Sequence, residues 1–495
     1  MTRKKRRETP PPPAPVVVDA ALERARSLLS AEDYAALTAE LEHPLRTAIR
    51  INPLKAEAAD LTGWASRYGW QVEPVPYCPA GWWLNSAEIS PAQTPEHRLG
   101  YFYIQDAASM LPVELFDFTE PPALLLDLAA SPGGKTTHLI SRTGDQTLTI
   151  ANDASASRIQ ALRIVLGGWG TTHQAVTNFP GEKFGGWFPE QFDAVLLDAP
   201  CSMESLRSTE SHPMRAISTR ERATLAQRQA RLLTSALLAV RNGGQVVYST
   251  CTLSPEEDEA VLDAVLRRFG RGVRVDDLSE RLPGPAPALD SANGSVFDPQ
   301  VTRAARLWPH RFGTSGFFAA RLTRLEDLPG EVEPEPARPL ERTGWAPLAQ
   351  ASAQALKQFF NDQFGFDLEG WLAANRLELW GFRERRYAIP AAFLARFAGL
   401  PVQMLGLLLG EETAGEFEIS HEAAARLGKL FKAGKAAMPE SSIPAWLKGE
   451  DLPLELSAPF SAGAVILLTG PDGQALGRGR VGPQRIKNLL PRRMG

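Results

Sequence analysis

The stretch that decides the fold is LLLDLAASPGGK, at residues 124–135. Its apolar start is typical of a buried strand in a parallel sheet. Asp127 ends that strand, and a loop of small residues leads through Gly133 and Gly134 to a helix expected to begin near Lys135. A strand that feeds a glycine loop at a helix N-terminus is where open α/β sheets bind a cofactor, and glycine lets the backbone approach the ligand closely. The stretch therefore predicts a cofactor site.

Two kinds of cofactor compete for this loop. Gly134, Lys135 and Thr136 resemble the end of a phosphate-binding P-loop, G-x-x-x-x-G-K-[ST], but that loop needs a glycine where this chain has Ala129. The later strand that ends at Asp198 could hold magnesium in a nucleoside triphosphatase. This alternative leaves two downstream cysteines unexplained.

The two cysteines follow two further apolar strands. Cys201 lies in DAPCS at 198–202, and Cys251 lies in YSTCT at 248–252. Each cysteine comes just past the carboxyl end of a predicted strand, the edge at which open α/β sheets place their active sites. Together with DLAASPGGKT at 127–136, these segments resemble the Nol1/Nop2/Sun family of RNA (cytosine-5)-methyltransferases, in the family's order. The resemblance is close over residues 40 to 325 and looser beyond them.

Strands and helices alternate through this region, which predicts an α/β fold with a doubly wound, mostly parallel sheet. This agrees with the Rossmann-like fold of S-adenosylmethionine-dependent methyltransferases that the resemblance implies. We expect strands at 123–128, 147–152, 173–177, 192–198, 244–250 and 316–322, and helices at 135–143, 156–167, 220–241 and 254–269.

The rest of the chain divides by composition and resemblance. A basic, proline-rich start predicts a disordered tail, and a proline- and glutamate-rich run predicts a linker. The expected segments are a tail at 1–18, a small N-terminal α+β domain of RNA-binding character at 19–100, the methyltransferase domain at 101–326, the linker at 327–340, a C-terminal α+β extension at 341–410 and a PUA-like RNA-binding module at 411–495.

Composition bounds the cellular setting. The chain has 495 residues, a net charge of −4 and three cysteines, and its basic N-terminus has no apolar segment behind it. No apolar run reaches the length of a membrane span, so we expect a cytoplasmic protein in a reducing compartment, without membrane or metal partners. Cys78 is expected to be a small, partly buried residue, and the arginines at 383–386 a solvated face. The basic run at 478–493 fits a phosphate-facing role as well as a solvated surface.

Basic and amide residues also follow each other in RTAIRINPLK, at residues 46–55. The run predicts a short strand that ends at Pro53 and carries Arg46, Arg50, Asn52 and Lys55. These side chains could contact phosphates or form a solvated strand face.

The resemblance implies a covalent mechanism. A thiolate adds to carbon 6 of cytosine and activates carbon 5 for methylation, after which a base removes the carbon 5 proton. By resemblance Cys251 is the nucleophile, and Cys201 assists proton removal or enzyme release. Asp198 could hold a proton for cytosine N3, which would require a raised pKa.

The cofactor implied is S-adenosylmethionine. Its methionine part is expected against the loop Ala129, Ala130, Ser131, Pro132, Gly133, Gly134 and Lys135, with Asp153 at the ribose, Asn178 near the adenine and Asp198 at the edge of the site. The chain departs from the family pattern in three places. Ser131 stands where alanine is usual, Asn178 where aspartate is usual, and Met203 in a turn that commonly contains glycine.

These observations predict a methyltransferase that forms 5-methylcytosine in RNA. The long C-terminal half favours 16S ribosomal RNA or the small ribosomal subunit over transfer RNA, and we expect a monomer. The thiolate can reach carbon 6 only in an extruded or single-stranded cytosine. The alternatives are transfer RNA as the substrate, a non-catalytic RNA-binding or assembly protein, and the nucleoside triphosphatase.

Overall fold

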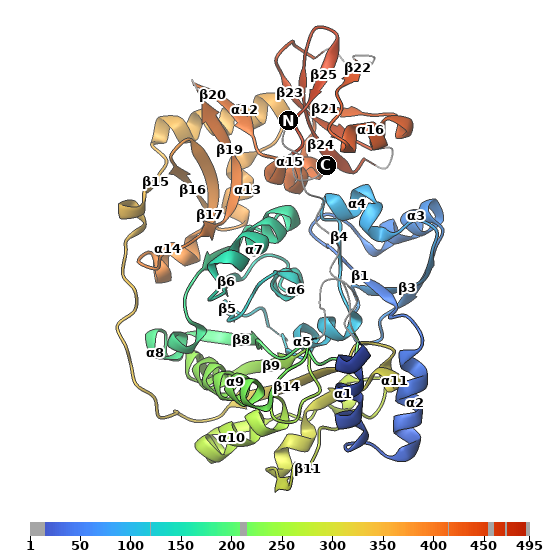
Figure 1. Cartoon of the computed structure of the whole chain (residues 1–495). Helices are drawn as coiled ribbons and strands as arrows, with labels where there is room; N and C mark the ends of the chain where they lie inside the picture. Colours follow the sequence, from blue (N-terminus) through green and yellow to red (C-terminus); the bar gives the residue numbers. More distant parts are fainter. Residues whose placement is uncertain are drawn as a thin grey trace, which may run out of the picture.

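A computed structural model describes residues 15–118, 120–207, 215–413, 415–453, 460–470 and 473–491. Within them the chain builds four main sheets, and the C-terminal sheet lies next to the N-terminal one (Figure 1), with which it shares a hydrophobic core. The expected disordered tail at 1–18 falls largely on residues 1–14, which lie outside the described ranges. Its last residues belong instead to the first helix, which begins at Pro15.

The N-terminal part combines a helical hairpin with a small antiparallel sheet. The sheet has the order β2-β3-β1-β4, and aromatic side chains from β2, β4 and α3 pack on one face of it. Its elements are α1 (Pro15–Arg26), α2 (Ala31–Leu41), β1 (Thr47–Ile51), α3 (Ala58–Tyr68), β2 (Trp70–Pro74), β3 (Gly81–Ala87), α4 (Pro95–Arg98) and β4 (Phe102–Ile104).

The central sheet has nine strands and confirms the doubly wound α/β fold. Its order is β10-β14-β9-β8-β5-β6-β7-β18, with β13 paired to β14. The five strands from β9 to β7 are parallel. Strands β14 and β18 run antiparallel to them, and β10 and β13 run antiparallel to β14. The bounds are β5 (Leu124–Asp127), β6 (Leu148–Asn152), β7 (Gln174–Thr177), β8 (Phe192–Asp198), β9 (Val240–Thr250), β10 (Val273–Val275), β13 (Ala305–Leu307), β14 (Phe317–Arg324) and β18 (Met404–Leu405).

Helices cover both faces of this sheet, because successive strand residues point to opposite faces. Leu124 and Leu126 pack with α9 and α10, whereas Leu125 packs with α5 and α6. The helices and the one small hairpin are α5 (Leu111–Glu114), α6 (Gly134–Arg142), α7 (Ala156–Trp169), α8 (Phe184–Trp187), α9 (Thr219–Ala239), α10 (Glu259–Phe269), α11 (Pro309–Phe312), β11 (Ser291–Ala292) and β12 (Ser295–Val296).

The expected elements agree with these bounds except at two ends. Strand β9 begins at Val240 rather than at residue 244, and α10 begins at Glu259 rather than at residue 254. The turn before α10 stays non-helical because its acidic side chains are bound inward. Asp258 accepts a hydrogen bond from the Thr250 hydroxyl at 2.6 Å, and Arg306 pairs with Asp258 and Glu259 in the interior.

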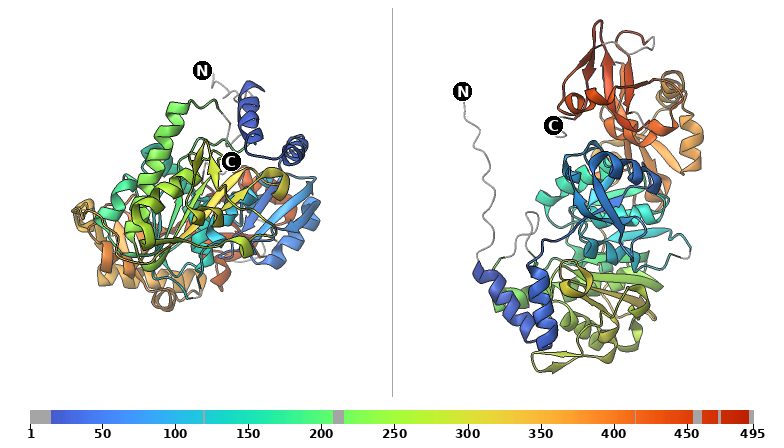
Figure 2. Two further views of the ribbon diagram at one scale, coloured as in Figure 1. Left: turned by 90° about the horizontal axis from the view of Figure 1, so that it is seen from below. Right: turned by 90° about the vertical axis from the view of Figure 1, so that its right-hand side faces the viewer.

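The C-terminal half contains two further five-stranded sheets, which lie together at one end of the molecule (Figure 1 and Figure 2). The expected boundary at residue 410 falls inside β19, whose pairing with β17 and β20 keeps residues 345–419 in one sheet. The first sheet and its helices are β15 (Trp345–Pro347), α12 (Gln350–Phe364), α13 (Leu368–Ala374), β16 (Leu377–Phe382), β17 (Arg385–Pro390), α14 (Ala391–Phe397), β19 (Leu407–Thr413) and β20 (Glu416–Ile419).

The last unit mixes two helices with a sheet of order β21-β23-β24-β25-β22. Its elements are α15 (His421–Leu427), β21 (Lys435–Ala437), α16 (Ile443–Leu447), β22 (Leu452–Pro453), β23 (Val465–Thr469), β24 (Ala475–Val481) and β25 (Arg485–Asn488). Across all described ranges, no helix combines the length and the apolar character that a membrane span requires.

The expectation for Arg50, Asn52 and Lys55 is wrong, because all three side chains are buried between domains. Arg50 donates to the Gly134 carbonyl at 2.9 Å, Asn52 to the Trp169 carbonyl at 3.0 Å and Lys55 to the Gly168 carbonyl at 2.6 Å. The polar face of β1 therefore joins the N-terminal sheet to the ends of α6 and α7, and it is unavailable to phosphates.

Candidate functional site

The two cysteines meet at the carboxyl edge of the central sheet. Strands β8 and β9 are parallel neighbours, with Asp198 opposite Ser249, so the segments that follow them emerge side by side. The Sγ atoms of Cys201 and Cys251 lie 3.4 Å apart, and both residues are only partly buried. The fold thus brings together two thiols that are 50 residues apart in the chain.

The two thiols differ in their electrostatic surroundings. The hydrogen bond with Cys251, together with burial, raises the pKa of Cys201 well above its usual value. The Lys135 ammonium lies within electrostatic range of Cys251. Burial disfavours the charge on Lys135, but electrostatic attraction to Asp198 and Cys251 outweighs burial, and the pKa of Lys135 is raised above its usual value. Lys135 therefore stays cationic in the neighbourhood of Cys251, whereas Cys201 holds its proton.

Asp198 is held by two donors at the end of β8. Lys135 Nζ donates to its Oδ2 at 2.7 Å, and Ser249 Oγ donates to its Oδ1 at 2.8 Å. The side chain keeps 32% of its exposure, so this carboxylate remains open to a molecule in front of the sheet. Asp198, Lys135 and the two cysteines thus face the same edge.

The loop after β5 has the features of a cofactor cradle. Gly133 has φ +116°, which side-chain-bearing residues rarely adopt, and a Cβ on Gly134 would come within 3.0 Å of the Tyr103 ring. Ser131 Oγ and Asp127 Oδ1 are buried and have no hydrogen-bond partner among the described residues. Burial raises the pKa of Asp127 to about 7. Unsatisfied polar atoms beside a glycine turn fit the polar methionine end of S-adenosylmethionine.

Asp153 and Asn178 form a second part of the same cradle. The Asp153 carboxylate accepts the backbone N–H groups of Ser155 at 2.8 Å and Ser131 at 3.2 Å, which ties the end of β6 to the glycine loop. Asn178 Nδ2 donates to the Asp153 carbonyl at 2.7 Å. This contact uses the Asn178 amide nitrogen and leaves the side-chain oxygen as an acceptor.

The turn after Cys201 adopts the conformation that makes glycine common there. Met203 has φ +62° and Leu206 has φ +63°, in the left-handed region. The turn is held from outside, because Glu204 forms ion pairs with Arg222 at 3.0 Å and with Arg24 of α1 at 2.6 Å. The α1–α2 hairpin thus packs directly on the loop that carries Cys201, a contact that sequence patterns did not predict.

Four polar residues that no sequence pattern singled out connect the two cysteine loops. Ser202 Oγ and Thr252 Oγ1 lie 3.0 Å apart, and Glu257 Oε2 accepts the Ser202 N–H at 2.9 Å. Gln229 of α9 donates to that same Glu257 oxygen and to the Pro200 carbonyl, both at 2.9 Å. Gln229 follows no motif, so the sequence carried no signal for it.

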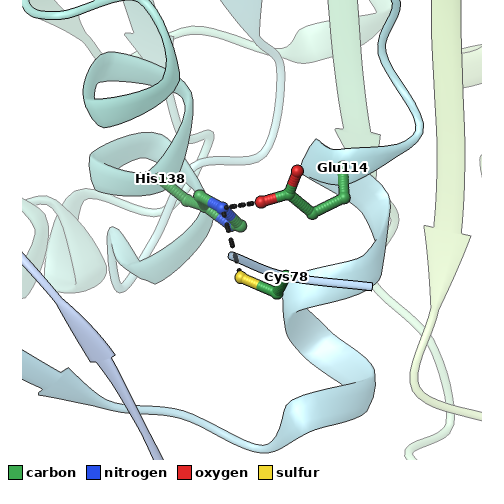
Figure 3. A group of neighbouring side chains, drawn as sticks. All are labelled: Cys78, Glu114 and His138. Carbon is green, nitrogen blue, oxygen red and sulfur yellow. Dashed lines mark hydrogen bonds and ion pairs between the residues drawn. The ribbon is translucent and has the colours of Figure 1, made fainter. Parts of the chain in front are cut away.

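A separate buried cluster joins Cys78, Glu114 and His138 from three segments of the chain (Figure 3). His138 Nε2 lies 2.8 Å from Glu114 Oε1 and 3.8 Å from Cys78 Sγ. Burial lowers the pKa of His138 to about 4 and raises the pKa of Cys78 to about 12, so both are neutral. Arg142 pairs with the other Glu114 oxygen. The three side chains therefore form a buried hydrogen-bonded cluster. Cys78 is fully buried, not partly buried as expected.

The basic runs of the C-terminal half are largely paired with glutamates. Arg385 and Arg386 form ion pairs with Glu411 and Glu412 on the neighbouring strand, at 2.8 and 2.7 Å. In the last unit, Arg478 and Arg480 both pair with one acceptor, Glu418. These arginines are therefore partly neutralised within the fold.

The chain resembles known proteins over nearly its whole length. The family model described as 16S rRNA methyltransferase RsmB/F matches residues 118–323, and the model for the N-terminal domain of 16S rRNA methyltransferase RsmF matches residues 19–107. The ribosomal RNA small subunit methyltransferase F of Aeromonas salmonicida is 33% identical over 471 residues, 94% of each chain. The protein of the same name from Erwinia tasmaniensis is 32% identical and covers 96% of this chain and 95% of its own.

Solved structures agree. A methyltransferase homologue from Pyrococcus horikoshii is 31% identical with a TM-score of 0.53, over 63% of this chain and 100% of its own. NSun6 from Pyrococcus horikoshii, solved with SFG, is 20% identical with a TM-score of 0.51 over 62% of this chain and 98% of its own, which supports the fold. With a cysteine-bearing sheet edge, a matching cofactor cradle and these relatives, the chain belongs to the RsmB/F family of RNA methyltransferases, enzymes whose cofactor is S-adenosylmethionine.

Proposed function

We propose that this enzyme forms 5-methylcytosine in the 16S ribosomal RNA of the small subunit, through a covalent bond between Cys251 and carbon 6 of the target base. The observation that carries the proposal is the 3.4 Å approach of two thiols beside Asp198 and Lys135. Attack at carbon 6 needs one thiolate, and release of the product needs a group that accepts the carbon 5 proton. The substrate follows the printed names of the relatives, which are small-subunit ribosomal RNA methyltransferases.

The electrostatics favour Cys251 as the nucleophile. Cys251 is the thiol within range of the Lys135 cation, whereas Cys201 keeps its proton. In the proposed sequence the Cys251 thiolate forms the S–C6 bond, and the electron pair displaced from the C5–C6 double bond makes carbon 5 nucleophilic. After methylation a base takes the carbon 5 proton, the double bond re-forms and Cys251 leaves as a thiolate. Cys201 acts in this second half as that base, once its own proton has passed to solvent.

Asp198 and Lys135 act at the other edge of the base. Charge builds up on the pyrimidine N3 and O2 as the thiolate adds, and a donor aimed at this edge lowers the barrier. The Lys135–Asp198 pair can relay a proton to N3: the Lys135 ammonium gives a proton to the Asp198 carboxylate, 2.7 Å away, and Asp198 passes that proton on. We assign Lys135 this shared role with Asp198.

The cofactor, when bound, supplies the methyl group. The residues that would hold it are those of the cradle: Ala129 to Lys135 at the methionine end, Asp153 at the ribose hydroxyls and Asn178 at the adenine. Orphaned Ser131 Oγ and Asp127 Oδ1 would gain partners there. The cradle opens at the same strand ends as the cysteines, which suits direct transfer between cofactor and base.

The remaining domains are proposed to bind the RNA around an extruded cytosine, with the enzyme acting as a monomer. The N-terminal sheet and the C-terminal unit, the expected PUA-like module, lie beside each other next to the catalytic domain (Figure 1). Because Arg50, Asn52 and Lys55 are buried, the N-terminal domain would contact RNA through other residues.

The proposal is tested by incubating the protein with labelled S-adenosylmethionine and small subunits or their RNA, beside Cys251→Ala and Cys201→Ala variants. The wild type should label cytosine, and Cys251→Ala should label nothing. Cys201→Ala should accumulate a protein–RNA adduct that survives denaturant. An adduct that requires Cys201 instead would exchange the two thiol roles, and label in transfer RNA alone would replace the substrate. Cofactor binding without any labelled RNA would favour the non-catalytic alternative.

A further inference from the structure

We propose that Gln229 and Glu257 are positioning residues that hold Cys201 against Cys251 and thereby set the rate of the release step. This inference rests on the proposed function, since it assigns a support to the thiol that acts in release. Neither residue touches the reacting atoms, and both act through the backbone on either side of Cys201.

The contacts enclose Cys201 from both sides. The Pro200 carbonyl precedes it and accepts Gln229 Nε2 at 2.9 Å, while the Ser202 N–H follows it and donates to Glu257 Oε2 at 2.9 Å. Gln229 Nε2 also donates to Glu257 Oε2 at 2.9 Å, so the two side chains form one unit. The backbone groups that flank Cys201 are thus bound to a single fully buried pair.

The same pair is coupled to the other cysteine loop. Glu257 lies six residues beyond Cys251, in the turn that leads into α10, and Thr252 adjoins Cys251 directly. The Ser202 and Thr252 hydroxyls are 3.0 Å apart. A shift of the Glu257 turn would therefore move both loops, and the 3.4 Å distance between the thiols depends on it.

The turn itself needs this support. Met203 and Leu206 adopt left-handed φ angles that are unfavourable for residues with side chains, so the loop would relax to another conformation without external contacts. Gln229 belongs to a 21-residue helix that packs on the sheet, so the position of its side chain is fixed relative to the sheet. Misplacing a reacting group by about 1 Å can slow a step by about a hundredfold.

The sharpest test compares Gln229→Met with Gln174→Met. Both glutamines are fully buried, each donates its amide to a backbone carbonyl, and each has an unpartnered side-chain oxygen. Gln174 lies at the start of β7 and bonds Gly406, away from the cysteine loops. The two substitutions therefore carry similar losses of stability, and only Gln229→Met loosens Cys201.

The measurements are single-turnover adduct formation, steady-state adduct fraction and product formation with labelled S-adenosylmethionine. Gln229→Met should form the adduct within about threefold of the wild-type rate but release product about 10- to 100-fold more slowly. Its adduct should accumulate as in Cys201→Ala, while Gln174→Met should resemble the wild type. Glu257→Gln keeps an oxygen acceptor and removes the charge, so it should retain turnover within about threefold.

Equal slowing of adduct formation and release in Gln229→Met would overturn the positioning role, as would a release rate equal to that of Gln174→Met. A loss in Glu257→Gln as deep as in Gln229→Met would mean that the Glu257 charge acts rather than the contact. If wild type and Cys201→Ala form no adduct at all, the covalent mechanism fails, which is a distinct outcome from failure of this inference.

Discussion

Replacing Arg50 by methionine should both destabilise the protein and weaken cofactor binding. Arg50 is fully buried and donates to Gln105 Oε1 at 3.1 Å, to the Gly134 carbonyl at 2.9 Å and to Thr137 Oγ1 at 2.7 Å. Burial lowers the pKa of Arg50 to about 10, so the side chain is charged at neutral pH. Methionine keeps the apolar stem but removes every donor.

The magnitude follows from what the substitution leaves behind. A charged hydrogen bond contributes about 1.5–3 kcal/mol, and removing three would give a large loss if nothing compensated. Two terms reduce it: the Gly134 carbonyl keeps the Thr137 hydroxyl as a donor at 2.9 Å, and the burial penalty of the guanidinium disappears. We therefore expect the free energy of unfolding to fall by about 3 kcal/mol. Because Gly134 begins α6 and ends the cofactor loop, affinity for the cofactor should fall about tenfold.

Arg46→Met is the matched control. Arg46 comes just before the same strand, but its side chain is 34% exposed, stacks on the Trp83 ring at 3.8 Å and pairs with Glu73 at 3.4 Å. Its loss should lower the free energy of unfolding by about 1 kcal/mol or less, without an effect on the cofactor. Urea titration and calorimetric binding of S-adenosylhomocysteine measure both quantities. Equal losses of stability in the two variants, or unchanged affinity in Arg50→Met, would refute the argument that the domain interface supports the cofactor loop.

Three further predictions concern pH and backbone strain. Burial lowers the pKa of Lys55 from 10.5 to about 7. Between these two pH values the unfolded chain keeps the Lys55 proton and the folded protein does not, so the free energy of unfolding should rise with pH. Urea midpoints at pH 7 and 9 should show this rise in the wild type, and Lys55→Met should abolish it. Burial raises the pKa of Asp127 from 3.8 to about 7. Between these two pH values only the folded protein keeps the Asp127 proton, so the free energy of unfolding should fall as the pH rises. In the same urea titration Asp127→Asn should flatten that fall between pH 4.5 and 7, and an unchanged slope would contradict the raised pKa. Alanine is usually more stabilising than glycine, but the Met203 φ of +62° favours glycine. Met203→Gly should therefore be more stable than Met203→Ala by about 1 kcal/mol in thermal unfolding. The opposite order would show that the loop rearranges.

The sequence by itself determined the catalytic sheet and the place of its chemistry. Apolar strands that end in Asp127, Asp198 and Thr250 predict parallel neighbours, and the carboxyl ends of such strands share an edge. That rule predicts that Cys201 and Cys251 lie at the same edge, whereas their 3.4 Å approach depends on β8 and β9 being neighbours in the sheet. Local signals also located the main helices, with errors only where side chains such as Asp258 are bound inward.

What only the tertiary structure decided depends on partners far away in the chain. Arg50 and Lys55 look like solvated or phosphate-binding residues in their own segment, but their acceptors lie 84 and 113 residues further on, at Gly134 and Gly168. Strand β18 comes from the C-terminal half and pairs with the catalytic sheet. It is two residues long, which is too short to give a periodic sequence pattern. The support of Cys201 by Gln229 has the same origin. A polar side chain is buried only when its donors find acceptors, and those acceptors are fixed by how the domains pack, not by the residues next to it.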